Sequence, residues 1–347
     1  MKKRIVSGVC LFSVVIGITA CTNPGNNSEH TCSENTNPSE IVSETPTHGL
    51  SNPDATPEAI ELYEYICSIY GNGIISGQQE STWMGSEQYE FEYIYEQTGK
   101  YPAIRGLDYM NDDFDGVNRR AIDWHNRGGI VTICWHCGSD FSKSWDACMN
   151  TSISDWKAAL TEGTDEYNKL IAGMDKAAEA LLELKEQNIP VLWRPFHEFD
   201  GAWFWWGKGG AANFRKLWQI MYDRYTNYWE LDNLIWVLGY SQNGKIYDSW
   251  YPGDEYVDIV GADSYKDGAN HNLYQAVEKV ASEDTPICFH ECGRIPTVEQ
   301  LQQKNTNWVW FMTWHTEYIT DKNDISDLKS IYNDEYVITL DELPKWN

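Results

Sequence analysis

Glu198 and Glu291 follow closely after short apolar runs. A glutamate at the end of such a run is suited to acid–base chemistry. These runs cover residues 189–193 and 286–289. Two carboxyl groups that converge on one ligand can act as proton donor and nucleophile, the chemistry that cleaves a glycosidic bond. Either glutamate alone is also compatible with a structural ion pair.

The segment around the first glutamate, residues 194–207, is rich in aromatic side chains. Arg194, His197 and Glu198 are followed by four consecutive rings at residues 203–206. Core aromatics normally follow the period of a strand or helix, and these do not. Exposed apolar clusters mark binding surfaces. We interpret the rings as a platform for sugars, whose C–H faces stack on aromatic faces; a core role and a lid without chemistry are the alternatives.

The rest of the chain predicts the elements that position these residues. Short apolar runs typical of strands buried on both faces cover residues 73–76, 102–107, 129–135, 190–194, 234–238, 257–262, 286–289 and 308–313. Amphipathic helices are predicted at residues 57–70, 165–187, 211–228 and 324–332. This alternation predicts an α/β fold, a single (β/α)8 TIM barrel. An open doubly wound sheet is the alternative, but residues 76–80 lack its Gly-rich phosphate loop.

Catalytic side chains of such a barrel project from the C-terminal ends of its strands. Polar or aromatic residues expected there are Gln78, Asp108, Tyr109, His136, Arg194, His197, Glu198, Asp263, Tyr265, His290, Glu291, Trp314 and His315. Because the fourth and seventh strands lie nearly opposite, Glu198 and Glu291 can converge. Alternation along a strand predicts that His290 faces away from Glu291 and packs against helices.

Together these residues resemble glycoside hydrolase family 26, which consists mostly of β-mannanases. Residues 194–207, RPFHEFDGAWFWWG, are close to the family pattern RPxHExxGxWFWWG. Weaker similarities follow in the family's order: SGQQ at 76–79, YPA at 101–103, WH at 135–136, GADSY at 261–265 and ECG at 291–293. The residue before Glu198 is His197, which resembles the histidine of this family, whereas most related barrels have Asn at that position. The resemblance covers nearly the whole chain from about residue 52.

The resemblance implies a retaining endo-β-1,4-mannanase in which Glu198 is the acid/base and Glu291 the nucleophile. Burial beside aromatic rings should raise the pKa of Glu198. Arg194 and Tyr265 are the groups expected to hydrogen-bond Glu291 and keep it ionised.

The resemblance also implies which residues bind the sugar. Substrate contacts are expected from His136, His197, Trp203, Tyr265 and Trp314. Asp263 shares a strand face with Tyr265, and we expect it to form a structural hydrogen bond in the site. A distal subsite would be lined by Trp145 or Trp156, or by neither.

The beginning of the chain predicts export. Residues 2–4 are basic, and the apolar run at 9–18 is too short to span a bilayer. The sequence ITAC at 18–21 resembles a bacterial lipobox, with Cys21 as the lipidated residue; an ordinary cleavable signal is the alternative. We therefore predict a signal peptide at 1–20, a flexible tether at 21–52 and the barrel at 53–347. The protein is expected to be lipid-anchored to the bacterial cell envelope.

The net charge and the motifs limit the classes of molecule that the protein is expected to bind. The chain has 52 acidic and 26 basic residues and no basic cluster after Arg4, which argues against nucleic acid and anionic lipid as partners. We expect a monomer that acts on β-mannan, glucomannan or galactomannan and needs neither metal nor cofactor. The alternatives are a β-1,3-xylanase or mixed-linkage glucanase of the same family and, more remotely, a non-catalytic glycan-binding lipoprotein.

The cysteines form no regular framework. Cys134 and Cys137 mimic a redox or zinc pair, but no second pair lies at a matching distance, and we expect neither role. An oxidising compartment permits a disulfide such as Cys137–Cys148, although spacing does not determine the pairing.

Overall fold

The computed structural model describes residues 49–241, 245–266 and 268–346. The predicted signal peptide, Cys21 and most of the predicted tether lie outside these ranges. Ser51 and Asn52, at the end of the predicted tether, already contact the barrel domain through hydrogen bonds to Asp258 and Asp232. Within the described ranges, no helix combines the length and apolar character needed to cross a membrane.

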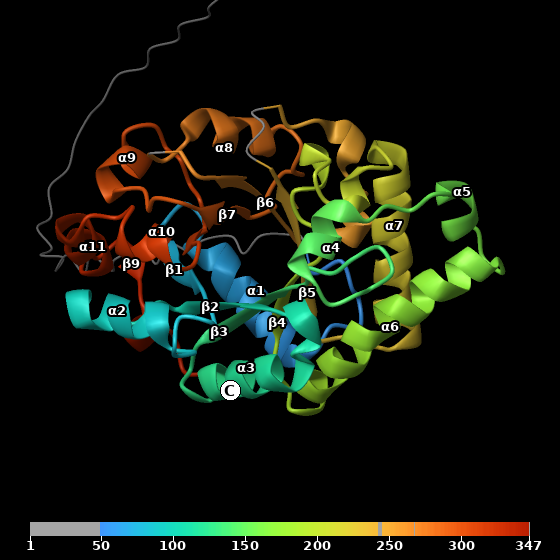
Figure 1. The fold of residues 1–347 in the computed structure, drawn as a ribbon. Helices are drawn as coiled ribbons and strands as arrows, with labels where there is room; N and C mark the ends of the chain where they lie inside the picture. Colours follow the sequence, from blue (N-terminus) through green and yellow to red (C-terminus); the bar gives the residue numbers. More distant parts are fainter. Residues whose placement is uncertain (1–48, 242–244, 267, 347) are drawn as a thin grey trace, which may run out of the picture. The chain divides into compact units, whose positions relative to one another are not determined.

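A closed parallel barrel forms the centre of the described part of the chain (Figure 1). Its eight strands are β1 (Ile74–Gln79), β2 (Ile104–Asp108), β3 (Ile130–Cys134), β4 (Val191–Arg194), β5 (Leu234–Tyr240), β6 (Ile259–Ser264), β7 (Ile287–Cys292) and β8 (Trp310–Thr313). Each strand pairs in parallel with the next, and β8 pairs with β1. The predicted barrel is confirmed, and the open sheet is wrong. A short strand that was not predicted, β9 (Val337–Ile338), pairs with the start of β1.

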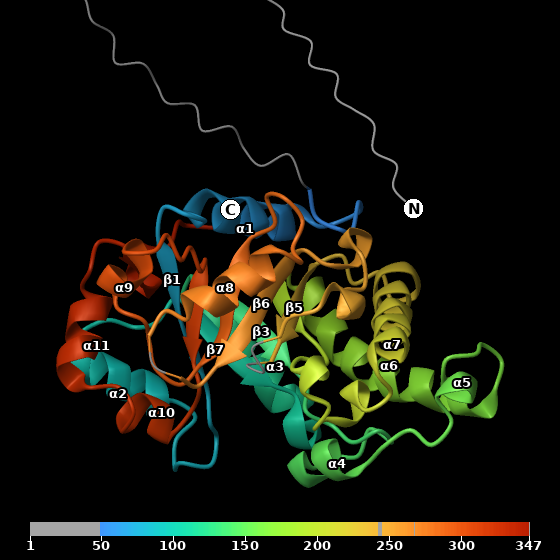
Figure 2. The ribbon, with the colours of Figure 1, turned by 90° about the horizontal axis from the view of Figure 1, so that it is seen from above.

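Helices surround this barrel (Figures 1 and 2). They are α1 (Pro57–Ile69), α2 (Tyr89–Thr98), α3 (Phe114–Asn126), α4 (Trp145–Asn150), α5 (Trp156–Ala159), α6 (Asp165–Glu186), α7 (Ala211–Asp223), α8 (His271–Glu278), α9 (Val298–Gln302), α10 (Glu317–Thr320) and α11 (Ile325–Tyr332). The four predicted helices correspond to α1, α6, α7 and α11. A π-helical turn, η4 (Arg224–Tyr228), continues α7 over the rest of its predicted range.

Helix α1 closes the N-terminal end of the barrel. Thr56 caps this helix by accepting a hydrogen bond from the Ala59 N–H at 3.2 Å. Leu62 and Ile66 pack in one apolar cluster with residues of the barrel interior, such as Ile75 and Leu192. Figure 2 shows α1 and α4 at opposite ends of the barrel. Since α1 fills one end with apolar side chains, the polar side chains of the strands, such as Gln78 and Glu291, lie toward the other end.

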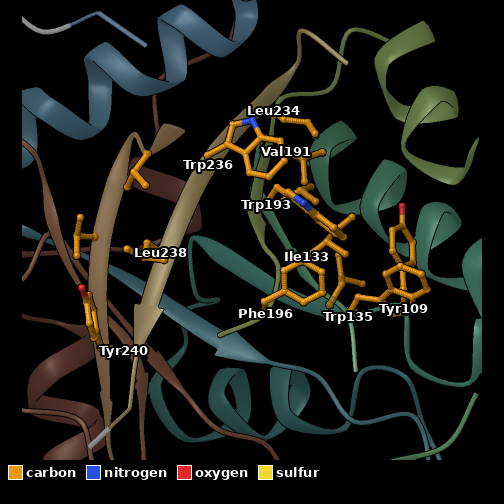
Figure 3. Close-up of a cluster of buried hydrophobic side chains, with 14 of the residues drawn as sticks. Tyr109, Ile133, Trp135, Val191, Trp193, Phe196, Leu234, Trp236, Leu238 and Tyr240 are labelled. Carbon is orange, nitrogen blue, oxygen red and sulfur yellow. The ribbon is translucent and has the colours of Figure 1, made fainter. Parts of the chain in front are cut away.

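The strands are buried on their outer face as well. Trp193 of β4 and Trp236 of β5 pack in the outer apolar layer (Figure 3), whereas their neighbours Leu192 and Ile235 belong to the interior cluster. This alternation is the period of a strand. Burial on both faces explains why the strands are almost continuously apolar in sequence.

Several strands continue beyond their predicted apolar runs at the C-terminal end of the barrel. β1 extends through Gln78 and Gln79, β6 through Asp263, and β7 through Glu291. These polar side chains are buried. The apolar pattern ends where the barrel interior becomes polar, so the prediction ended these strands too early. Asp263 and Glu291 consequently stand on strands, which hold a side chain more rigidly than a loop does.

Candidate active site

Glu198 lies in a tight turn directly after β4. Phe196 and Glu198 have φ angles of +52° and +54°, in the left-handed region that residues with a Cβ rarely adopt. The Glu198 N–H donates to the Gly239 carbonyl of β5 at 2.8 Å, which fixes the turn to the neighbouring strand. Backbone strain held in place by surrounding contacts is characteristic of functional sites.

Most of the aromatic cluster behind Glu198 is core, so the prediction of a four-ring sugar platform is wrong for three of its rings. Phe204, Trp205 and Trp206 are buried, and only Trp203 is partly exposed. The Trp206 indole N–H donates to the His197 carbonyl at 2.7 Å, and the Trp205 indole N–H donates to the Cys137 carbonyl at 2.9 Å. The buried rings therefore anchor the strained turn, and Trp203 alone can face a ligand.

Glu198 contacts the exposed ring directly. The Trp203 indole N–H donates to Glu198 Oε2 at 2.9 Å. Gly201 permits this placement, because a Cβ there would lie 2.2 Å from the Trp203 ring. Burial and the charge of Glu291 raise the pKa of Glu198 to about 8, and the indole hydrogen bond opposes this rise.

Glu291 has a more strongly polar environment. Tyr265 donates its hydroxyl hydrogen to Glu291 Oε2 at 2.8 Å, and Arg194 donates to Oε1 at 3.3 Å. Burial raises the pKa of Glu291, but Arg194, His136 and Tyr265 favour its ionised form. The expected contacts of Arg194 and Tyr265 with Glu291 are therefore present.

His290 faces the site rather than the helices, which corrects the sequence prediction. The pairing of β6 with β7 shifts at this point: Ala262 is opposite Phe289, but Asp263 is opposite Glu291, so His290 is an extra residue in a bulge. The His290 Nδ1 lies 2.6 Å from Asp263 Oδ1, and Nε2 lies 2.9 Å from the Arg194 guanidinium. Burial lowers the pKa of His290 well below its usual value, consistent with a neutral ring that accepts from Arg194.

Arg194 is fully buried and is held by further residues that the sequence analysis did not assign to the site. Its Nε–H donates to the Thr132 hydroxyl at 3.0 Å, and Nη2 donates to Gln79 Oε1 at 3.1 Å. Thr132 lies inside an apolar strand, where a hydroxyl gives no functional signal. Gln79 was visible in the SGQQ motif, but β1 was predicted to end before it.

Two histidines line the space beside Glu291. His136 and His197 meet edge to face, with ring centroids 4.7 Å apart. His136 Nδ1 lies 2.6 Å from Asp108 Oδ2, which fixes its ring, and His197 Nε2 lies 3.5 Å from Glu291 Oε1. Burial and the neighbouring His136 lower the pKa of His197 well below its usual value. His197 is therefore a neutral hydrogen-bonding group.

Two further tryptophans reach this region. Trp314, directly after β8, is partly exposed, and its backbone N–H donates to the Cys292 carbonyl at 2.9 Å. Trp145 is exposed, with its ring centroid 4.6 Å from that of His136. Trp156 instead stacks on Trp205. Of the two residues considered for a distal subsite, only Trp145 therefore adjoins the site.

The described residues include two groups whose ligand atoms are close enough to hold a metal ion. These are Asp108 with Cys134 and His136, and Asp263 with His290 and Glu291. In each group a histidine–carboxylate hydrogen bond uses the ring nitrogen nearest the carboxylate. Burial raises the pKa of the Cys134 thiol well above its usual value, which disfavours the thiolate that binds metals.

The cysteines of the described segments are free thiols. Cys137 and Cys148 are both buried and unbridged, so the disulfide that the sequence permitted is not formed. Burial raises the pKa of both thiols and makes them poor nucleophiles.

The fold and this site define a class of protein. A closed (β/α)8 barrel with two buried glutamates, one after β4 and one on β7, beside partly exposed tryptophans is the architecture of a glycoside hydrolase. The chain belongs to glycosyl hydrolase family 26, whose family model matches residues 51–342.

Individual relatives agree with this family. A mannan endo-1,4-β-mannosidase of Thermothelomyces thermophilus is 35% identical over 318 residues, covering 86% of this chain and 64% of that protein. The crystal structure of a ruminal endo-β-1,4-mannanase is 35% identical with a TM-score of 0.81, covering 90% of this chain and 73% of that one. The β-mannanase from a symbiotic protist of the termite Reticulitermes speratus, complexed with a gluco-manno-oligosaccharide, is 27% identical with a TM-score of 0.79, covering 86% and 98%.

The chain spans 51% to 64% of the length of four mannan endo-1,4-β-mannosidases that it matches. The similarity to these relatives therefore concerns only part of their length.

The bulged His290 gives a testable prediction about stability. His290→Phe keeps a ring of similar size but removes the link between Arg194 and Asp263, leaving the buried Arg194 guanidinium and the buried Asp263 carboxyl group each short of a hydrogen-bond partner. We expect the free energy of unfolding, measured by urea denaturation, to fall by about 3 kcal/mol. As a control, His125→Phe at a half-buried position should change it by less than about 0.5 kcal/mol. Equal losses in the two variants would contradict this account.

Proposed function

We propose that this protein is a retaining endo-β-1,4-mannanase. The observation that supports this best is the pairing of Glu198 and Glu291 in unlike surroundings. Glu198 has a pKa raised to about 8, whereas Glu291 lies against the Arg194 guanidinium and the Tyr265 hydroxyl. Two carboxyl groups in such unlike surroundings suit the roles of proton donor and nucleophile.

In the first step the ionised Glu291 attacks the anomeric carbon of the sugar. Glu198 donates its proton to the glycosidic oxygen, and the bond from carbon to that oxygen breaks. The products are a glycosyl ester on Glu291 and the departing sugar chain with its new hydroxyl. Arg194 and Tyr265 hold the Glu291 carboxylate in position for the attack.

In the second step water hydrolyses the ester, with Glu198 now as the base. Esterification removes the charge of Glu291, which is one of the causes of the raised pKa of Glu198. The pKa of Glu198 therefore falls after the first step, which suits a carboxylate that must accept a proton from water. Release of Glu291 returns both groups to their starting states.

Mannan as the substrate is supported by the relatives rather than by the catalytic pair. Relatives at 34% and 35% identity bear the name mannan endo-1,4-β-mannosidase, and the termite protist enzyme was crystallised with a gluco-manno-oligosaccharide. We expect the partly exposed rings of Trp203 and Trp314 to stack on sugar faces on either side of the cleavage point. His136 and the neutral His197 are suited to hydrogen-bond sugar hydroxyls.

Removal of either carboxyl group tests the assignment. Glu198→Ala and Glu291→Ala should each lower mannan cleavage at least about a thousandfold, because each removes one partner of the double displacement. The assay is chromatography of the products from mannan, galactomannan, β-1,3-xylan and mixed-linkage glucan, with melting temperature as the check on folding. Full activity in either variant would exclude the catalytic pair, and cleavage of β-1,3-xylan or mixed-linkage glucan alone would replace mannan as the substrate.

Azide distinguishes the two roles in the same experiment. It should rescue Glu198→Ala on an aryl glycoside with a good leaving group, because only the second step then lacks its base. The product should be a glycosyl azide of retained configuration. With Glu291→Ala, any azide product should have inverted configuration; the opposite pattern would exchange the two roles.

The raised pKa of Glu198 predicts the alkaline limit of activity. Glu198 must be protonated to act as the acid, so kcat/KM should fall as the pH rises through about 8. The Trp203 indole stabilises the ionised carboxylate, so Trp203→Phe should raise the pKa and move this limb to higher pH. A limb that stays in place, or moves to lower pH, would contradict the role of this hydrogen bond. The measurement is a pH profile of kcat/KM for both proteins.

We also propose that the mature protein is a lipoprotein of the bacterial cell envelope, monomeric and anchored through Cys21. The basic start, the short apolar run and the ITAC sequence support this proposal. Expressed in a bacterial host, the wild-type chain should enter the membrane fraction and incorporate radiolabelled palmitate, whereas Cys21→Ser should do neither. Labelling of Cys21→Ser at the wild-type level would exclude this anchor. Cys32→Ser is the matched control and should behave as the wild type.

A further inference from the structure

A third carboxyl group lies on the same turn as the acid/base and has no role in the mechanism described so far. Asp200 follows Glu198 by two residues, in the 3₁₀ turn η2 (Phe199–Gly201). Its Oδ1 accepts a hydrogen bond from the N–H of Ser241, directly after β5, at 2.7 Å. The family pattern RPxHExxGxWFWWG does not specify the residue at this position.

The hydrogen bond from Ser241 completes an edge of β5 that β4 leaves open. β4 pairs with β5 only as far as Trp236. Beyond that pair, the Glu198 N–H donates to the Gly239 carbonyl at 2.8 Å. Two residues further on, the Ser241 N–H donates to Asp200. Backbone groups two residues apart on a strand point to the same neighbour, so the turn of the acid/base takes the place of β4 along this edge.

This hydrogen bond does not by itself require a charged side chain. Asparagine or serine can accept from an N–H and carries no charge that must be removed from water. Asp200 is partly exposed, yet its Oδ2 is enclosed and has no hydrogen-bond partner among the described residues. Burial raises the pKa of Asp200, and the Ser241 N–H opposes this rise. A charge that is partly removed from water without a cation beside it lowers stability, and such groups are characteristic of functional sites.

The charge of Asp200 acts on the acid/base. Burial, the charge of Glu291 and the charge of Asp200 raise the pKa of Glu198, whereas contacts with Trp203 and Asp263 lower it, and the result is a pKa of about 8. Asp200 therefore acts on Glu198 in the same direction as the nucleophile does.

Other titratable groups on this side of the turn do not replace Asp200. Burial and the charge of Asp200 raise the pKa of Tyr240 on β5, so this phenol is neutral. Asp248, on η5 (Asp248–Trp250), also acts on Tyr240 but is exposed to solvent, and it is not among the groups that shift the pKa of Glu198. Asp200 is thus the carboxylate on this side whose charge reaches the acid/base.

The charges of Glu291 and Asp200 differ in what happens to them during the reaction. Esterification removes the charge of Glu291, whereas Asp200 forms no bond and keeps its charge. In the second step Glu198 accepts a proton from water, and the water oxygen bonds to the anomeric carbon. The ester bond breaks and its electron pair returns to the Glu291 carboxylate. A base whose pKa has fallen too far is weak in this step.

We propose that Asp200 is a positioning residue that fastens the turn of Glu198 to β5 and supplies a constant negative charge, so that Glu198 remains a competent base after Glu291 is esterified. The proposal rests on the function proposed above. It gives the two carboxylates beside the acid/base separate tasks: the charge of Glu291 is lost and restored in each turnover, and the charge of Asp200 persists through it.

Asp200→Asn separates the charge from the hydrogen bond, since an amide oxygen can still accept from Ser241. Loss of the charge should move the alkaline limit of kcat/KM on mannohexaose to lower pH by roughly half a unit. A dinitrophenyl β-mannobioside has a leaving group that needs little acid, so the second step limits its turnover. Its kcat should fall about threefold, because Glu198 becomes a weaker base. Below the alkaline limit, kcat/KM on mannohexaose should stay within about twofold of the wild type.

Asp248→Asn is the matched control, since it removes one negative charge from an exposed carboxyl group. Its pH limit and both rates should equal those of the wild type. Melting temperature checks the fold, and Asp200→Ser, which is also uncharged, gives the same comparison if Asp200→Asn does not fold.

Three results would overturn the role of Asp200 while leaving the proposed function standing. They are an alkaline limit that stays in place or moves to higher pH, an equal shift in Asp248→Asn, and an equal loss of rate in both steps, which a purely structural residue would give. If the wild type cleaves neither mannohexaose nor mannan, the proposed function itself fails, and the role of Asp200 with it.

Discussion

A buried positive charge is the constraint on which the site depends. The Arg194 guanidinium is completely enclosed, and a charge removed from water must be paired and hydrogen-bonded. Its partners come from three other strands: Gln79 from β1, Thr132 from β3, and His290 with Glu291 from β7. The barrel is the scaffold that brings these strands to one point. The same contacts that satisfy the arginine orient Glu291 and favour its ionised form, so one set of hydrogen bonds serves both the buried arginine and the carboxylate.

The other glutamate is controlled by different means. Glu198 stands on a strained turn and has an indole N–H beside it but no guanidinium. The turn is held by Trp205 and Trp206, whose indole N–H groups donate hydrogen bonds to backbone carbonyls of the surrounding loops. Most of the aromatic residues in this segment therefore maintain geometry, and Trp203 alone is left to meet a ligand. One short segment therefore contains both the buried rings that hold the turn and the one ring that can contact a ligand.

The parts of the structure that follow from simple periodicity could be predicted from the sequence. Strands buried on both faces are mostly apolar, which allowed the barrel and its polar end to be predicted. The start of helix α1 could be predicted from Thr56 and Pro57. The bulge at His290 was not, because one extra residue in a strand changes neither composition nor apolar pattern. The sequence also did not show which of the four consecutive aromatic residues are buried, since their order contains no period that separates Trp203 from Trp206. Thr132 was missed because a single hydroxyl in an apolar strand is ordinary.

The closure of the barrel between β1 and β8 has a consequence for how the molecule forms. Ile75 near the start of the domain pairs with Trp310 near its end, and Gln79 reaches Arg194 from the first of these strands. A growing chain that has been synthesised only as far as β6 contains Arg194 but neither β7 nor its carboxylate. Contacts of such high sequence separation form late and slow the folding of a chain. The pairings that close the barrel are therefore also the ones that bring the partners of Arg194 together.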